Sequence, residues 1–77
     1  MIRLEKIKIK NDTVECMAFP EDSKEGCVLR YNVKTKEKDY ILPKGYEYCD
    51  VHMTMACIFF RDNYENGLPE TKIIMWY

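Results

Sequence analysis

Apolar and polar residues alternate through the first forty positions of the chain, which is the pattern of short, half-buried antiparallel strands. Two such runs flank Asn11-Asp12, a pair that tolerates the left-handed backbone of a tight hairpin turn. With the turn at that pair, Ile9 faces Val14 on one side of the sheet, and Lys8 faces Glu15 on the other. The sequence therefore predicts a first hairpin with a defined register.

The apolar positions of this hairpin change parity towards its open end. Near the turn, Ile7 is expected to face Cys16 on the same side as Ile9. Further out, the apolar residues occupy the alternate positions in both strands: Ile2, Leu4, Met17 and Phe19. This change indicates either a sheet covered on both faces or a strong twist.

A second hairpin follows a polar loop at residues 20–26, which contains Pro20 and Gly26. Alternation then resumes, and a turn near Thr35-Lys36 would pair Tyr31 with Tyr40 and Leu29 with Leu42. These four residues would lie on one face. The chain ends in an aromatic and β-branched run, residues 72–77, which reads as a fifth strand.

Residues 46–65 are predicted to form a helix, although strict alternation from Cys49 to Phe59 would also suit a strand. Length favours the helix, because the segment far exceeds the usual strand of about 5–6 residues. At about 100° per residue, one narrow stripe is polar. It comprises Glu47, Asp50, Thr54 and Arg61. Gly45 or Asp50 could cap the start, and Asn66-Gly67-Leu68-Pro69 is a strong stop signal.

We therefore expect residues 1–77 to form a single compact α+β domain of order β-β-β-β-α-β. A small antiparallel meander sheet of four strands would pack on one helix, with a C-terminal fifth strand. A chain of this length buries only about 60% of the surface that it exposes when unfolded. Such small cores are often stabilised by disulfides, a metal or a second subunit.

Composition and charge narrow the functional classes. Hydrophobic residues make up 47% of the chain and the formal net charge is −1, which is a globular balance without the basic excess typical of nucleic-acid binding. No run is apolar enough for a signal peptide or a membrane span. We expect a cytoplasmic protein without membrane contact, in which the four cysteines are free thiols.

The helical segment is apolar over about 260° of its circumference, more than the stripe of about 100° that covers one sheet face. One flank contains Cys49, Met53, Ala56, Cys57 and Phe60. A second flank is left to be covered by a protein partner or a second copy, unless the sheet curls around the helix. We expect the contact surface to comprise Tyr48, Val51, Met55, Ile58, Phe59 and Trp76.

A reactive thiol is a weaker alternative. Cys49 would lie near a helix N-terminus, which lowers a thiol pKa, with His52 one turn away. The pair lacks an orienting third group, and the neighbouring acids Glu47 and Asp50 oppose thiolate formation. A metal site is not expected, because the cysteine spacings do not match those of structural zinc sites.

Two groups of lysines suggest single-stranded nucleic-acid binding as another alternative. They are Lys6, Lys8 and Lys10 on one strand, and Lys34, Lys36 and Lys38 around the second turn. Sheets that bind single strands combine cations with stacking aromatics. Tyr31 and Tyr40, however, are expected to face the core, and alternating lysines commonly protect a sheet face and edge.

No catalytic constellation, cofactor motif or small-molecule site is evident, and an enzyme is not expected. The sequence favours a small non-enzymatic protein-interaction module that self-associates or binds a larger protein. Nucleic-acid binding and thiol redox chemistry at Cys49 remain the alternatives.

Overall fold

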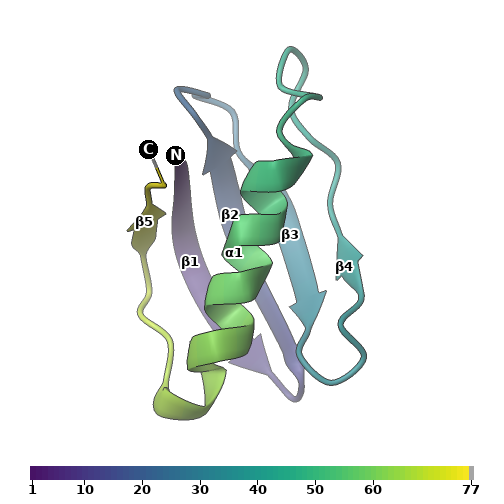
Figure 1. The fold of residues 1–77 in the computed structure, drawn as a ribbon, viewed down its shortest axis with the longest axis vertical. Coiled ribbons are helices and arrows are strands. Elements are labelled where there is room, and N and C mark those ends of the chain that lie inside the picture. Colours follow the sequence, from purple (N-terminus) through teal and green to yellow (C-terminus); the bar gives the residue numbers. More distant parts are fainter. Residues whose placement is uncertain (77) are drawn as a thin grey trace.

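A computed structural model of the protein describes residues 1–76. One antiparallel sheet of five strands, in the order β4-β3-β2-β1-β5, carries a single helix on one of its faces (Figure 1). The strands are β1 (Ile2–Lys10), β2 (Thr13–Pro20), β3 (Cys27–Asn32), β4 (Lys38–Asp39) and β5 (Lys72–Ile74), and the helix is α1 (Asp50–Asn63), followed by the short 3-10 helix η1 (Tyr64–Asn66). This arrangement confirms the predicted α+β fold, its meander and its fifth strand.

The first hairpin has the predicted register near its turn. Ile9 pairs with Val14 and Lys8 with Glu15, and Asn11 has the left-handed φ of 56° that the turn requires. The expected direct pairing of Ile7 with Cys16 is replaced by a β-bulge, in which two residues of β1 lie opposite Cys16.

The bulge explains the change of parity in β1. Lys6, one of its two residues, has a φ of 54°, and the extra position reverses the alternation so that Ile2, Leu4 and Ile7 are all buried. In β2 the parity does not change, because Val14, Cys16, Ala18 and Pro20 are all buried while Met17 and Phe19 are only partly covered. Neither a second covered face nor unusual twist is needed.

The second hairpin differs from the prediction by two residues in register. Tyr31 pairs with Lys38 rather than with Tyr40, and the backbone N–H of Asn32 donates to the carbonyl of Glu37 at 2.9 Å. The side chain of Asn32 accepts from the backbone N–H groups of residues 34 and 35, which places the turn earlier than Thr35-Lys36. A shift of two residues preserves the face, so Tyr40 and Leu42 still pack against the core.

Helix α1 begins at Asp50, four residues later than predicted, and Cys49 is its N-cap residue. The segment before it forms successive turns, with the N–H of Tyr46 bonded to the carbonyl of Pro43 and that of Cys49 to Tyr46. At the other end, η1 stops at Gly67, whose φ of 87° suits glycine. The stop signal is therefore confirmed, and the strand alternative for this segment is wrong.

Strand β5 pairs with β1, which brings the last described residues beside the first. Ile2 lies opposite Ile74, and β5 runs beside β1 in Figure 1. The strand is shorter than the predicted 72–77, because regular pairing ends at Ile74; residue 77 lies outside the described part of the chain. Among residues 1–76, no helix has the length and hydropathy needed to cross a membrane.

A candidate interaction surface on helix α1

The two apolar flanks of α1 have different environments. The flank predicted to contain Met53, Ala56, Cys57 and Phe60 faces the sheet, and all four side chains are buried. The other flank points away from the sheet. We call it the outward face and define it by Tyr48, Val51, Met55, Ile58 and Phe59.

The centre of the outward face is a short aliphatic stripe. Val51, Met55 and Ile58 follow each other at helical spacings of four and three residues, so they line one side of α1. Val51 is 60% exposed and Tyr48, just before the helix, is 70% exposed, whereas Met55, Ile58 and Phe59 are partly covered. The sheet does not curl around the helix to bury this stripe.

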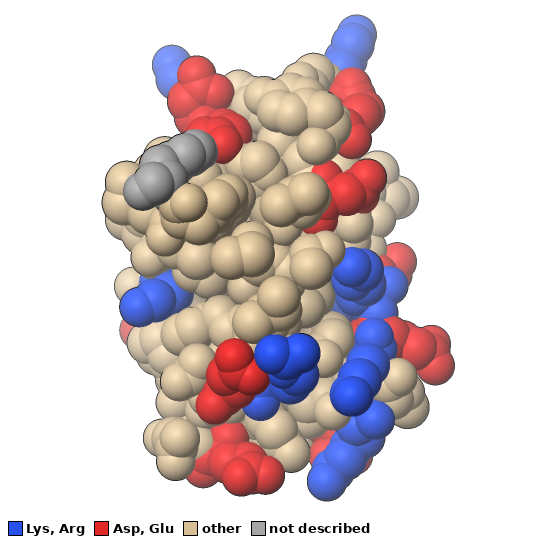
Figure 2. Space-filling view, viewed as in Figure 1, with Lys and Arg blue, Asp and Glu red and all other residues tan. Residues whose placement is uncertain are grey.

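Polar and charged side chains border the stripe. On the β4 side, the ammonium of Lys38 donates to the hydroxyl of Thr54 at 3.1 Å, and the Tyr40 hydroxyl donates to Asp50 at 2.6 Å. Figure 2 shows this side of the molecule, where uncharged residues cover most of the surface over the helix and most charges lie around it. An apolar centre with a polar rim is the usual anatomy of a protein contact surface.

Two of the six predicted contact residues are partly engaged by the fold itself. Phe59 packs against the core, and the ammonium of Lys72 lies 5.3 Å from its ring centroid. Trp76 is half-buried and meets the ring of His52 edge-on, with centroids 4.9 Å apart. The structure thus leaves Tyr48 and Val51 exposed and Met55 and Ile58 partly covered on one flank, and it packs Trp76 against His52.

Cys49 and His52, the residues of the thiol alternative, both lie at the start of α1 and are both buried. Burial, reinforced by the negative charge of Glu21, raises the pKa of the Cys49 thiol above its ordinary value. A raised pKa disfavours the thiolate at neutral pH, which is the opposite of what a nucleophilic cysteine requires.

His52 has a partner that the sequence does not reveal. Its Nε2 lies 2.6 Å from Oε1 of Glu21, and the N-terminal ammonium of Met1 lies 3.4 Å from the same oxygen. A carboxylate can only accept, so Nε2 carries the proton, and the buried Nδ1 has no hydrogen-bond partner among the described residues. The contact joins α1 to the loop after β2. Because 31 residues separate the partners, no local pattern could have identified it.

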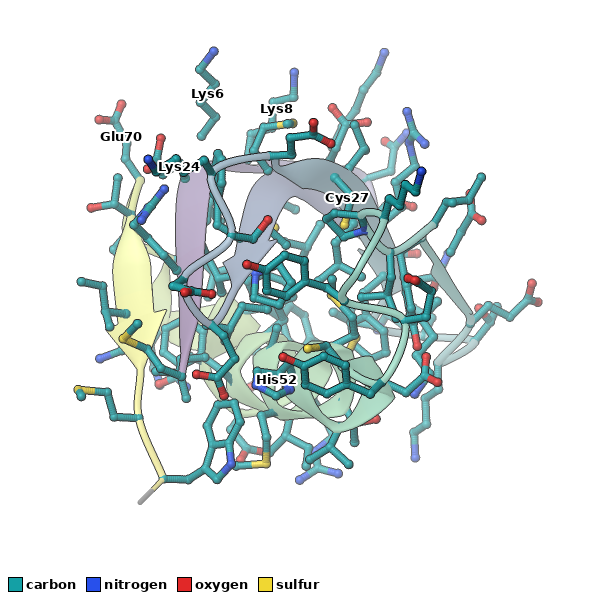
Figure 3. All side chains as sticks on the ribbon, turned by 90° about the horizontal axis from the view of Figure 1, so that it is seen from above. Lys6, Lys8, Lys24, Cys27, His52 and Glu70 are labelled. Atoms are coloured by element: carbon teal, nitrogen blue, oxygen red, sulfur yellow. The ribbon has the colours of Figure 1, made fainter. Side chains whose placement is uncertain are left out.

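The six lysines of the nucleic-acid alternative do not form one surface. Lys6 and Lys8 point away from α1, on the uncovered side of the sheet (Figure 3). Lys38, in contrast, reaches α1, and Lys34 and Lys36 lie in the turn between β3 and β4.

A shallow groove of about 410 Å³ lies on the uncovered side of the sheet and is lined by Lys8, Lys10, Asn11, Thr13, Glu15 and Arg30. Its charges are partly neutralised, because Glu15 lies 3.4 Å from Lys8 and 2.8 Å from Arg30. The hydrogen bond from Lys8, together with Arg30, lowers the pKa of Glu15, which keeps this carboxylate charged. Tyr31 is buried on the helix side, so it provides no stacking surface in the groove.

The four cysteines are free thiols, as predicted. Burial raises the pKa of Cys16 to about 12 and that of Cys57 to about 11. Within residues 1–76, no three histidine, cysteine, aspartate or glutamate side chains are grouped so that they could hold a metal ion.

Comparisons with known proteins add no family. No protein-family model matches the chain, and no curated protein or solved structure matches it either.

Proposed function

We propose that this protein is a non-enzymatic interaction module that acts through the outward face of α1, and that its first partner is a second copy of the chain. The observation that carries the proposal is the exposure of Val51, at 60%, at the N-terminal end of an aliphatic stripe, while the opposite flank of α1 is buried against the sheet. Covering such a stripe removes apolar surface from water at about 25 cal/mol per Å².

A contact limited to one helix face belongs to the small, transient class of interfaces. We therefore expect a dimer that dissociates in the micromolar range, and a monomer–dimer equilibrium that is visible between about 1 μM and about 1 mM. Light scattering coupled to size-exclusion chromatography, with sedimentation at several loading concentrations, measures this equilibrium directly.

The decisive variant is Val51→Lys. Lysine forms helix well and the site is exposed, so folding should be preserved. The charge within the contact should raise the dissociation constant at least tenfold, because each copy loses about 1.5 kcal/mol of apolar burial.

Ile41→Lys is the matched control. Ile41 is 85% exposed and lies in the segment after β4, outside the outward face. The Ile41→Lys variant should leave the monomer–dimer equilibrium unchanged. A wild-type chain that stays monomeric over the whole concentration range, or equal effects of the two variants, would rule out self-association through this face.

A further inference from the structure

The two sides of the outward face differ in polarity. The side next to β4 is polar and contains Asp50, Thr54 and Arg61, with Lys38 bonded to Thr54. The side next to β5 contains Phe59, with the ammonium of Lys72 of β5 5.3 Å from the Phe59 ring centroid. At the C-terminal end of the stripe, exposed Asp62 follows Ile58 by four residues and pairs with Arg61. The aliphatic stripe runs between these two sides.

This asymmetry distinguishes the two ways in which a twofold axis can pair two helices face to face. An axis parallel to both helices places the polar side of one copy against the apolar side of the other. An axis perpendicular to the helices, which makes them antiparallel, places polar side against polar side and apolar side against apolar side. Only the antiparallel pair matches like with like.

The charges at the helix ends also favour the antiparallel arrangement. Asp50 and Arg61 are eleven residues apart, which is close to three turns and about 16 Å, so they lie on the same side of α1. Each already has a partner in its own chain, because Arg61 Nε lies 3.0 Å from Asp62 Oδ1 and Asp50 Oδ1 accepts from the Tyr40 hydroxyl. In an antiparallel pair centred between them, the other guanidinium N–H groups of Arg61 in one copy would meet the second carboxylate oxygen of Asp50 in the other. In a parallel pair, Asp50 and Arg61 of one copy would each face the apolar side of the other helix, and Asp50 would not meet Arg61.

The aliphatic stripe can also pack on itself about a twofold axis midway between Asp50 and Arg61. With the axis near Met55, the Met55 side chains of the two copies meet each other, and Val51 of one copy lies next to Ile58 of the other. The alternating positions let the side chains interdigitate along the contact.

We propose that two copies of this chain pair through the outward face with their α1 helices antiparallel, so that Asp50 of each copy lies beside Arg61 of the other. This proposal rests on the proposed function, since it specifies the partner and the orientation at the same surface.

Cross-linking at single engineered cysteines tests the orientation. The background is Cys27→Ser, because Cys27 is partly exposed whereas the other three native cysteines are buried. Met55→Cys places a thiol near the proposed axis. Asp62→Cys places one at the end of α1, where the antiparallel pair separates the two thiols by about 20 Å along the helix.

A short bis-maleimide should link the Met55→Cys dimer and leave the Asp62→Cys dimer unlinked, while light scattering confirms that both variants still dimerise. Linking at both positions would indicate parallel helices and overturn the proposed orientation. A dimer linked at neither position would place the contact on another surface. A purified chain that light scattering shows to be monomeric at every concentration would instead refute self-association itself.

Charge reversal provides a second readout. Asp50→Lys and Arg61→Glu should each weaken the dimer by up to about fivefold, and the double variant should recover most of the loss. Thermal unfolding of each variant at low concentration separates an effect on the monomer from an effect on the contact. Additive losses in the double variant would show that the two residues do not meet across the axis.

Discussion

Lys6 occupies the least favourable backbone conformation in the sheet. Its φ of 54° lies in the left-handed region, where an L-residue with a Cβ is disfavoured by about 1–2 kcal/mol. Glycine is the residue usually found at such a bulge position. The sequence has a lysine here within a run of alternating lysines, so no local signal predicts a bulge. The only indication is that the apolar positions of the first strand change parity.

We expect Lys6→Gly to raise the free energy of unfolding by about 0.5 kcal/mol, because relief of the left-handed strain outweighs the added entropy of the unfolded chain. Lys6→Val should lower it by about 1 kcal/mol, since a β-branched residue fits this region poorly. Urea unfolding measures both changes. Lys10→Gly, at a position of β1 without positive φ, is the control and should be destabilising. A loss in Lys6→Gly equal to that of the control would mean that the bulge is absent in solution.

At the scale of single elements, prediction succeeded where local chemistry determines geometry. The Asn11-Asp12 turn fixed the register of the first hairpin because two residues suffice for that turn. The register of the second hairpin was wrong by two because the side chain of Asn32 reorganises the loop, and either register keeps Tyr40 on the core side.

The helix illustrates the same distinction. Its wheel correctly separated the buried flank from the outward face, because that separation depends only on helical spacing. Its first residue could not be predicted, because the turns from Tyr46 to Cys49 depend on bonds such as that from the Gly45 N–H to Glu47, and on the hydrogen bond between Tyr40 and Asp50.

The Tyr40–Asp50 hydrogen bond joins the segment after β4 to the first residue of α1, and it should make this junction sensitive to alkali. Burial, together with the hydrogen bond to Asp50, raises the pKa of Tyr40 from 10.0 to about 12. A raised pKa stabilises the fold fully below pH 10, and that contribution is lost as the pH rises from 10 through 12.

The variant Tyr40→Phe should lack this alkaline loss. The difference in unfolding free energy between wild type and variant is expected to be constant below pH 10 and to shrink between pH 10 and 12. Other groups with raised pKa values, among them Tyr46 and Cys16, are present in both proteins and cancel in the difference. Denaturant unfolding at intervals from pH 8 to 12 provides the measurement, and a difference independent of pH would contradict the proposed contribution of the bond.

At the scale of the whole molecule, the sequence could indicate an excess of apolar residues on the helix. It could not show which of them the fold would bury and which it would leave exposed. The wheel identified the exposed positions Tyr48 and Val51, which the sheet leaves uncovered. Trp76 was expected beside them, yet it packs partly against His52, because the path of the chain after β5 depends on pairing with β1.

If self-association stabilises the folded chain, its melting temperature must depend on concentration. Binding that involves only the folded state adds a stability that grows with the logarithm of concentration above the dissociation constant. We expect the melting temperature of the wild type to rise measurably from about 5 μM to about 500 μM, and that of Val51→Lys to stay constant. Differential scanning calorimetry at both concentrations tests this, with Ile41→Lys expected to behave as the wild type.

The position of β1 in the sheet makes its pairing with β5 the step that joins the most distant parts of the sequence. β1 lies between β2 and β5, and β5 comes from the opposite end of the chain. During synthesis, β1 to β4 and α1 emerge while one edge of β1 still presents unpaired backbone N–H and C=O groups beside Ile2 and Leu4. Open edges of this kind recruit strands from other chains. The pairing of Ile2 with Ile74 joins residues 72 positions apart, so we expect sheet completion to be a late step. A newly made chain is then most open to aggregation in the interval before that step.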